Sequence, residues 1–212
     1  MRERDESESA QLKDTWNKMV ASAVNVAKEE HKERVEKLLG ADDSRDTFYK
    51  FKAPLSTTVL CHGDYRVSNL LFRRLDSRLD PIVVDYQTVH SGCPVTDLLY
   101  FEFLGTDRDF RREYHQQLID HYFEQLTVAL DRLGIDVNEV YPRETFDIEY
   151  KEMSSSALCI AMAILPLVLV EAEQAPHMSG IQEVKDFAIS PSQLFAERYS
   201  GLVSDCVEWG VI

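Results

Sequence analysis

Residues 59–87 read VLCHGDYRVSNLLFRRLDSRLDPIVVDYQ, and the interpretation of the whole chain starts from this stretch. It contains two short apolar runs, each followed by polar side chains that carry oxygen. His62 and Asp64 follow the first run, and Asn69 comes five positions after Asp64. Asp85 follows the second run directly. The stretch therefore places two carboxylates and one amide beside segments that read as buried strands.

This set of residues suits magnesium-dependent phosphoryl transfer. That reaction needs a carboxylate to orient the attacking hydroxyl, and oxygen ligands that hold Mg²⁺ against the phosphates. The catalytic loop of kinases, H-R-D-x-x-x-x-N, supplies both functions. His62, Asp64 and Asn69 match three of its four fixed positions, while Gly63 replaces the Arg. The same template contains a second Asp, which follows a strand and binds Mg²⁺. Asp85 follows a strand in the same way.

The residues between Asn69 and Asp85 predict a β-hairpin. Residues 70–72 (LLF) form a short strand, residues 73–80 form a polar loop, and Pro81 begins a second, β-branched strand. Such a hairpin returns Asn69 and Asp85 to the same end, where one metal ion can contact both. Asp and Asn are also common turn residues before strands, so neither half of the motif is specific alone. The combination, in this order and spacing, is the specific signal.

Three segments together resemble the choline-kinase-like (CHK) family: LCHGDYRVSNLLFR, PIVVDYQ and PVTDLLYF. This family includes the ecdysteroid kinase-like proteins and is akin to choline kinases and aminoglycoside phosphotransferases. Its pattern is roughly HGD-x-W-x-x-N, then IDFQ, then P-x-x-D-L-x-Y-F. The resemblance extends from about residue 10 to the C-terminus and implies a kinase that uses ATP and Mg²⁺.

The resemblance also implies roles for individual residues. His62 is the motif His and Asp64 the catalytic base, so both are counted as catalytic. Asn69 and Asp85 are the Mg²⁺ ligands. Asp97 is the buried residue that braces the catalytic loop.

The floor of the site is assigned to Tyr86 and Gln87. Two positions depart from the family pattern. Arg66 stands where Trp is common, and Tyr86 stands where Phe is usual. Neither change removes a group that touches the metal ion or the transferred proton.

Elsewhere, apolar residues recur at steps of three and four and predict helices. We expect an α+β, mostly α chain, with residues 1–11 disordered and residues 12–212 forming a protein-kinase-like large (C-terminal) lobe with a small β-hairpin at the catalytic loop. Residues 1–58 contain no G-x-G-x-x-G and no V-A-I-K-like strand, so the smaller N-terminal β lobe is expected to be absent. Helices are predicted at residues 14–40, 96–105, 107–133 and 144–172, and residues 181–209 predict one or two closing helices with a break near Ser190 and Pro191.

The net charge and the cysteine content of the chain limit the classes of partner and the location that we expect. A net charge of −14 argues against nucleic acid and anionic membrane surfaces. Four scattered cysteines without a C-x-x-C predict reduced thiols and a cytoplasmic protein with no zinc site. Cys61 is interpreted as a core strand residue rather than a nucleophile. The apolar run 157–170 is shorter than a membrane span and contains Pro166, so a core helix is expected.

Two functions remain open at this point. The first is a small-molecule kinase lobe that phosphorylates a hydroxyl of an ecdysteroid-like or choline-like alcohol. The second is a non-catalytic remnant or truncated lobe that serves as a binding or regulatory module. The presence of Asp64, Asn69 and Asp85 favours the first, and the missing β lobe favours the second. Neither the acceptor nor the oligomeric state is indicated by the sequence.

Overall fold

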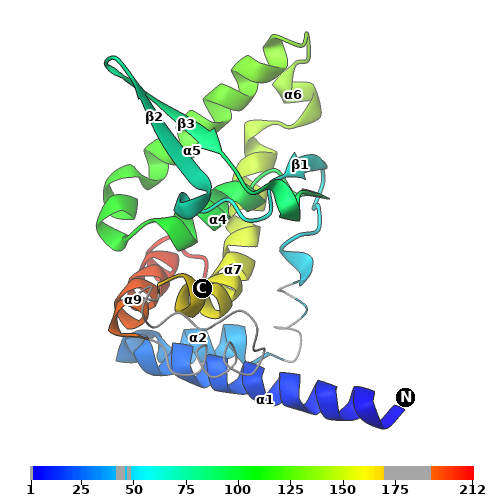
Figure 1. Cartoon of the computed structure of the whole chain (residues 1–212), viewed down its shortest axis with the longest axis vertical. Helices are drawn as coiled ribbons and strands as arrows, with labels where there is room; N and C mark the ends of the chain where they lie inside the picture. Colours follow the sequence, from blue (N-terminus) through cyan, green and yellow to red (C-terminus); the bar gives the residue numbers. More distant parts are fainter. Residues whose placement is uncertain (1, 42–45, 47–48, 170–191) are drawn as a thin grey trace. The chain divides into compact units, whose positions relative to one another are not determined.

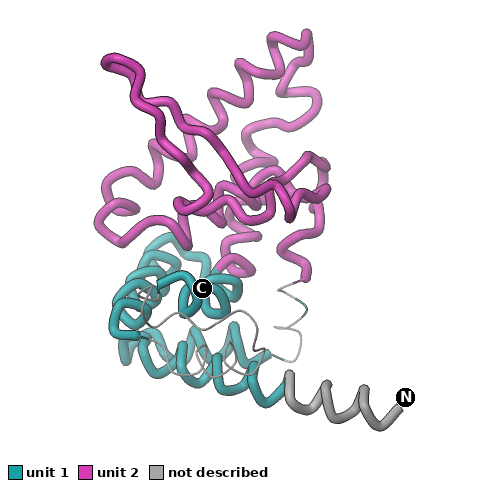
Figure 2. Tube along the Cα trace, viewed as in Figure 1, with its two compact units in different colours: residues 1–48, 158–212 teal, residues 49–157 magenta. Residues whose placement is uncertain are grey.

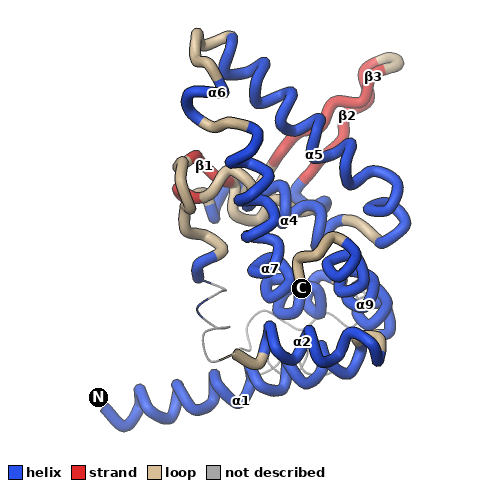
Figure 3. The backbone as a smooth tube through the Cα atoms, turned by 180° about the vertical axis from the view of Figure 1, so that it is seen from behind, coloured by secondary structure: helices blue, strands red, loops and turns tan. Residues whose placement is uncertain are grey.

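The structure is a computed structural model that describes residues 2–41, 46, 49–169 and 192–212, with the backbone alone for residues 2–12 (Figure 1). The chain divides into two compact units (Figure 2). Unit 1 comprises Met1–Phe48 and Leu158–Ile212, and unit 2 comprises Tyr49–Ala157. Helices dominate the described residues, and strands form two short antiparallel pairs among them (Figure 3). The prediction of an α+β, mostly α chain is thus confirmed.

Unit 1 is helical. It contains α1 (Arg2–Val26), the 3₁₀ turn η1 (Glu29–His31), α2 (Lys32–Leu39), the end of α7 (Arg143–Val168) and α9 (Gln193–Glu208). Its buried residues include Ala23, Val35, Leu39, Leu158, Met162, Leu165, Phe195, Tyr199 and Leu202. The end of the helix predicted at 144–172 and the start of the helical region predicted at 181–209 lie outside the described residues.

Helix α1 differs from the prediction at both ends. It begins at Arg2, so it includes the residues for which we expected disorder. These residues are poor in apolar side chains but contain Glu, Arg, Ala and Gln, which have high intrinsic helix propensity. The helix ends at Val26 and does not continue to Gly40, because η1 interrupts it. Gly40 caps α2 instead, and its N–H donates to the Glu36 carbonyl at 2.8 Å.

Unit 2 carries most of the remaining helices: α4 (Thr96–Gly105), α5 (Arg108–Asp131), the short α6 (Val137–Val140) and the first part of α7 (Arg143–Val168). Asp107 caps α5, and its carboxylate accepts a hydrogen bond from the Phe110 N–H at 2.8 Å. The core of the unit includes Leu98, Leu99, Phe103, Ile119, Tyr141, Phe146 and Tyr150.

Helix α7 is the one described helix that is long and apolar enough to cross a membrane, judged by length and composition. However, 67% of its most apolar window is buried inside the protein. Such burial is typical of a core helix, which is how the sequence was interpreted. Pro166 lies in the last turn of α7, where its missing N–H affects only the end of the helix.

The two strand pairs are nested. The outer pair joins β1 (Val59–Cys61) to β4 (His90–Gly92), with Cys61 opposite His90. The inner pair joins β2 (Leu70–Leu75) to β3 (Arg78–Val83), with Leu70 opposite Val83. The segment that carries the predicted catalytic residues therefore leaves one small sheet, forms a hairpin and returns to the same sheet.

The predicted loop at residues 73–80 is wrong. Only two residues separate β2 from β3, and the first of them, Asp76, has a positive φ of 52°. The polar residues belong to the strands because a two-stranded hairpin exposes its side chains to solvent. Asp80 pairs with Arg78 at 2.7 Å and with Arg73 at 3.5 Å. Pro81 lies inside β3 and is tolerated because a two-stranded sheet consists only of edge strands.

Candidate active site

The catalytic loop is anchored by a carboxylate from α4. Asp97 accepts the His62 N–H at 2.6 Å with one oxygen and the Gly63 N–H at 2.9 Å with the other. Gly63 has a φ of 83°, and a Cβ at this position would lie 2.5 Å from the Thr88 carbonyl oxygen. Glycine is thus required where the kinase template has Arg. Asp97 supplies the contacts expected of a brace.

His62 connects this loop to the end of β3. Its Nε2 lies 3.0 Å from the Val84 carbonyl, and its Nδ1 accepts the Asp64 N–H at 3.3 Å. Since a carbonyl can only accept, Nε2 carries the proton. The Thr88 hydroxyl donates to the His62 carbonyl at 2.9 Å. Both ring nitrogens are engaged with the backbone, so His62 positions the loop and is not placed to move a proton.

Three side chains hold the carboxylate of Asp64. The Tyr100 hydroxyl donates to Oδ1 at 2.9 Å, and the Asn69 amide donates to Oδ2 at 3.0 Å. The Arg66 Nε lies 3.1 Å from Oδ1 and 3.2 Å from Oδ2. Burial raises the pKa of the Tyr100 phenol, and the adjacent negative charge of Asp64 raises it further. Tyr100 therefore stays protonated and remains a donor to this carboxylate.

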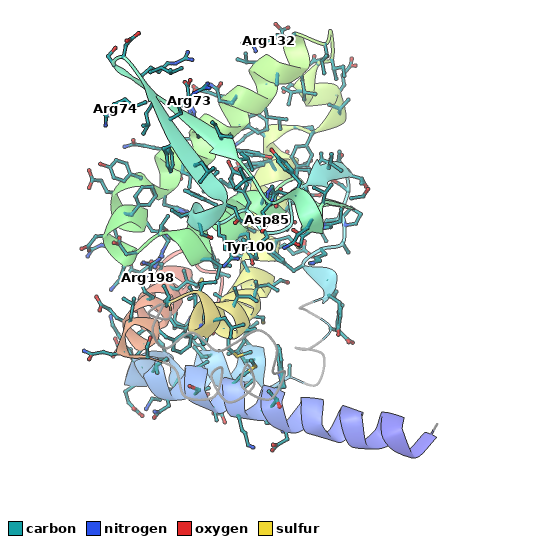
Figure 4. All side chains as sticks on the ribbon, in the orientation of Figure 1. Arg73, Arg74, Asp85, Tyr100, Arg132 and Arg198 are labelled. Carbon is teal, nitrogen blue, oxygen red and sulfur yellow. The ribbon has the colours of Figure 1, made fainter. Side chains whose placement is uncertain are left out.

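Asn69 and Asp85 lie at the same end of the β2–β3 hairpin. The Val84 N–H donates to the Asn69 carbonyl at 3.0 Å, next to Asp85 in the chain. In Figure 4, Asp85 lies at the end of the hairpin opposite the turn. Its φ of 67° and ψ of 58° are left-handed, an uncommon conformation that Asp tolerates better than most residues. Its carboxylate is exposed and receives a 3.4 Å contact from the Gln87 amide.

Asn69 and Asp85 carry the kinds of side-chain oxygen that Mg²⁺ uses in proteins. The Asn69 Nδ2 donates to the backbone carbonyl of Asp64 at 2.8 Å, and this acceptor fixes the orientation of the amide. The amide nitrogen is thus engaged with Asp64, which leaves the side-chain oxygen of Asn69 as the candidate ligand atom. No group of three or more His, Cys, Asp or Glu side chains gathers as a metal site within the described ranges. Mg²⁺ does not need such a group, because it uses one or two carboxylates together with phosphate and water.

Tyr86 and Gln87, the predicted floor of the site, lie on the 3₁₀ turn η3 (Tyr86–Thr88). Tyr86 is 60% exposed, and its ring centroid lies 5.0 Å from that of His62. Gln87 contacts the carboxylate of Asp85, as described above. Both residues thus adjoin the loop and the candidate metal ligands.

A groove of about 680 Å³ runs beside the catalytic loop. Residues of β1, the β2–β3 hairpin, α4 and α5 line it, and most of them are apolar. The lining includes His62 and Asp97 but none of Asp64, Asn69 and Asp85. The groove therefore adjoins the brace, and we do not assign the reacting groups to it.

Sequence reasoning missed Tyr100. Its signal was present in the segment PVTDLLYF, because Tyr100 lies three positions after Asp97 on α4 and so shares its face. His115 also has an internal partner that no local pattern indicates, although 17% of its side chain remains exposed. Its Nδ1 lies 2.7 Å from the fully buried Glu102, which also accepts a hydrogen bond from the Tyr150 hydroxyl.

Glu149 is, like Glu102, a buried carboxylate with several hydrogen-bond partners in unit 2. Glu149 accepts hydrogen bonds from the Ser56 hydroxyl at 2.5 Å, the Tyr141 hydroxyl at 2.5 Å and the Cys93 thiol at 3.3 Å. Burial, followed by the nearby Glu149 carboxylate, raises the pKa of Cys93 to about 12. The thiol is thus a protonated donor in a structural network.

The four cysteines are free and buried, and Cys61 is a core residue as predicted. Burial and then the charge of Asp97 raise the pKa of the Cys61 thiol from 9.0 to about 11. The unfolded chain therefore loses this proton at lower pH than the folded chain does. The stability that the neutral thiol contributes is complete below pH 9.0 and is lost as the pH rises towards about 11.

We therefore expect the free energy of unfolding to fall over this interval, and to fall less in Cys61→Ala. Urea denaturation at several pH values between about 8 and about 11 measures both slopes. Equal slopes in the two proteins would mean that Cys61 is not buried as a neutral thiol.

A sequence model of the ecdysteroid kinase-like family matches residues 2–135. No curated protein and no solved structure matches the chain significantly. The matched region includes the catalytic loop, the β2–β3 hairpin and Asp97, and it is more than half of the 212 residues. The chain therefore belongs to the ecdysteroid kinase-like family.

Proposed function

We propose that this chain is the large lobe of a small-molecule kinase, which transfers the γ-phosphoryl group of ATP to a hydroxyl of a small alcohol. Membership of the ecdysteroid kinase-like family supports phosphoryl transfer in general. The contact between Asn69 and Asp64 is the structural observation that best supports the proposal. The Asn69 amide donates to both the backbone carbonyl and the carboxylate of Asp64, so a candidate metal ligand holds the candidate base directly.

Each residue then has a defined task. Asp64 accepts a hydrogen bond from the acceptor hydroxyl and takes its proton. The hydroxyl oxygen forms a bond to the γ-phosphorus as the bond to the β–γ bridging oxygen breaks, and ADP leaves. Asn69 and Asp85 would hold Mg²⁺, which neutralises negative charge on the phosphates. Asp97 and His62 hold the backbone of the catalytic loop in place during the transfer.

The family name and the resemblance support an ecdysteroid-like or a choline-like alcohol as the acceptor. We place the protein in the cytoplasm, where its free thiols persist. One observation favours the alternative, a non-catalytic binding module. Arg66 forms an ion pair with Asp64, and a carboxylate held by a guanidinium is not free to accept a proton.

Unfolding in the presence of Mg-ATP tests the proposal. A ligand at one hundred times its Kd stabilises the folded chain by about 2.7 kcal/mol, which a thermal melt resolves. We expect wild type to be stabilised and Asp85→Asn to lose most of this effect. Asp80→Asn is the matched control, since it removes a carboxylate from the same hairpin but away from the candidate metal ligands. If Mg-ATP stabilises neither protein, or both hairpin variants equally, the assignment is wrong.

A further inference from the structure

Arg66 is the one departure from the family pattern that adds a charge to the site. Its Nε contacts both carboxylate oxygens of Asp64, at 3.1 and 3.2 Å. A guanidinium has five N–H donors, and this is the only hydrogen-bonding contact of the Arg66 side chain to the residues that the structure describes. Its side chain is 34% exposed, twice the 17% of Asp64. The guanidinium thus retains donors and access to solvent while it touches the base.

The guanidinium of Arg66 is a positive charge among several carboxylates. Asp64, Asp85 and Asp97 all lie in or against the loop, and the chain as a whole carries a net charge of −14. Arg73 pairs with Asp80 and lies nearer the turn of the hairpin in Figure 4. An anionic nucleotide that approaches Asp64 therefore meets Arg66 as the cation in direct contact with the base.

The geometry points to Arg66 as a binding residue for the γ-phosphoryl group of ATP, and this inference rests on the proposed function. An acceptor hydroxyl bonded to Asp64 is in line with the γ-phosphorus. A guanidinium that contacts both oxygens of Asp64 is then within reach of the equatorial oxygens of that phosphoryl group. Arg can bind phosphate through two parallel hydrogen bonds, whereas the Trp common in the family has a single N–H.

This role also resolves the conflict raised by the ion pair. When ATP binds, Arg66 exchanges the carboxylate of Asp64 for the γ-phosphate, which releases Asp64 to the acceptor hydroxyl. The base becomes available only when the group to be transferred is present. In ADP the γ-phosphate is missing, so Arg66 remains on Asp64.

The test compares the affinities for Mg-ATP and Mg-ADP, measured by calorimetry on the full chain. We expect Arg66→Gln to weaken Mg-ATP binding by about tenfold or more, the factor for one charge-assisted hydrogen bond, and to leave Mg-ADP binding within about twofold. Arg66→Trp, which carries the residue common in the family, should show the same selective loss. Arg73→Gln is the matched control and should change neither affinity.

The outcomes separate the two proposals. If wild type binds neither nucleotide, the proposed function fails, and the role of Arg66 fails with it. If wild type binds both but the two Arg66 variants keep the wild-type ratio of affinities, only the role of Arg66 is overturned. An equal loss for ATP and ADP in both variants also overturns it, since the contact would not involve the γ-phosphate.

Discussion

Asp64→Asn is expected to lower kcat for phosphoryl transfer by about 10²–10⁴-fold, the range attributed to a positioned general acid or base. The amide oxygen can still accept from Tyr100, so the side chain keeps part of its anchoring. It cannot take the proton of the acceptor hydroxyl. The expected result is therefore a large loss of turnover with a melting temperature close to that of wild type.

Steady-state transfer of radiolabelled phosphate to the alcohol, in the form of the enzyme that turns over, measures this effect. Asp80→Asn serves again as a control for the loss of one negative charge, and it should retain full activity. Unchanged turnover in Asp64→Asn would show that another group accepts the proton, and that the ion pair with Arg66 marks a structural role.

Asp97→Ala is expected to destabilise the protein by about 2–6 kcal/mol, since the N–H groups of His62 and Gly63 each lose their acceptor at about 1–3 kcal/mol. Both donors lie at the base of a loop with little solvent access. Chemical denaturation of the purified chain gives this value directly. Wild-type stability in Asp97→Ala would show that water replaces the carboxylate at both N–H groups.

Asp97→Asn is the matched variant for this position. Its single side-chain oxygen can satisfy one N–H, while its amide nitrogen faces the other donor, so the cost should lie between those of wild type and Asp97→Ala. Comparison with Asp64→Asn separates the two carboxylates of the site. Asp64→Asn should reduce activity at nearly constant stability, whereas Asp97→Asn should mainly reduce stability.

The parts of the site that could be predicted from the sequence are those built by neighbours in the chain. Asn69 and Asp85 flank two apolar runs, so a hairpin between them was a local inference, and the structure contains that hairpin. The length of its turn was not predictable from polarity, because exposed strands have the same composition as a loop.

The contacts made by α4 were beyond local reasoning. Asp97 is more than thirty positions from His62, and only the family resemblance linked the two. Tyr100 and His115 were missed because their partners, Asp64 and Glu102, become neighbours only when helices pack. Polar side chains that are buried by tertiary contacts look like surface residues in a sequence.

The nesting of β2–β3 inside β1–β4 predicts an order of folding. A hairpin with a two-residue turn closes with little loss of chain entropy and forms in about 1–10 μs. The β1–β4 pair then closes a loop that the hairpin has already shortened, whereas Asp97 must be delivered by the docking of α4. The turn of the hairpin therefore becomes ordered first, the opposite end that carries Asn69 and Asp85 follows, and the loop that carries Asp64 becomes ordered last. Substitutions in β2 or β3 should slow refolding, while Asp97→Ala should mainly accelerate unfolding.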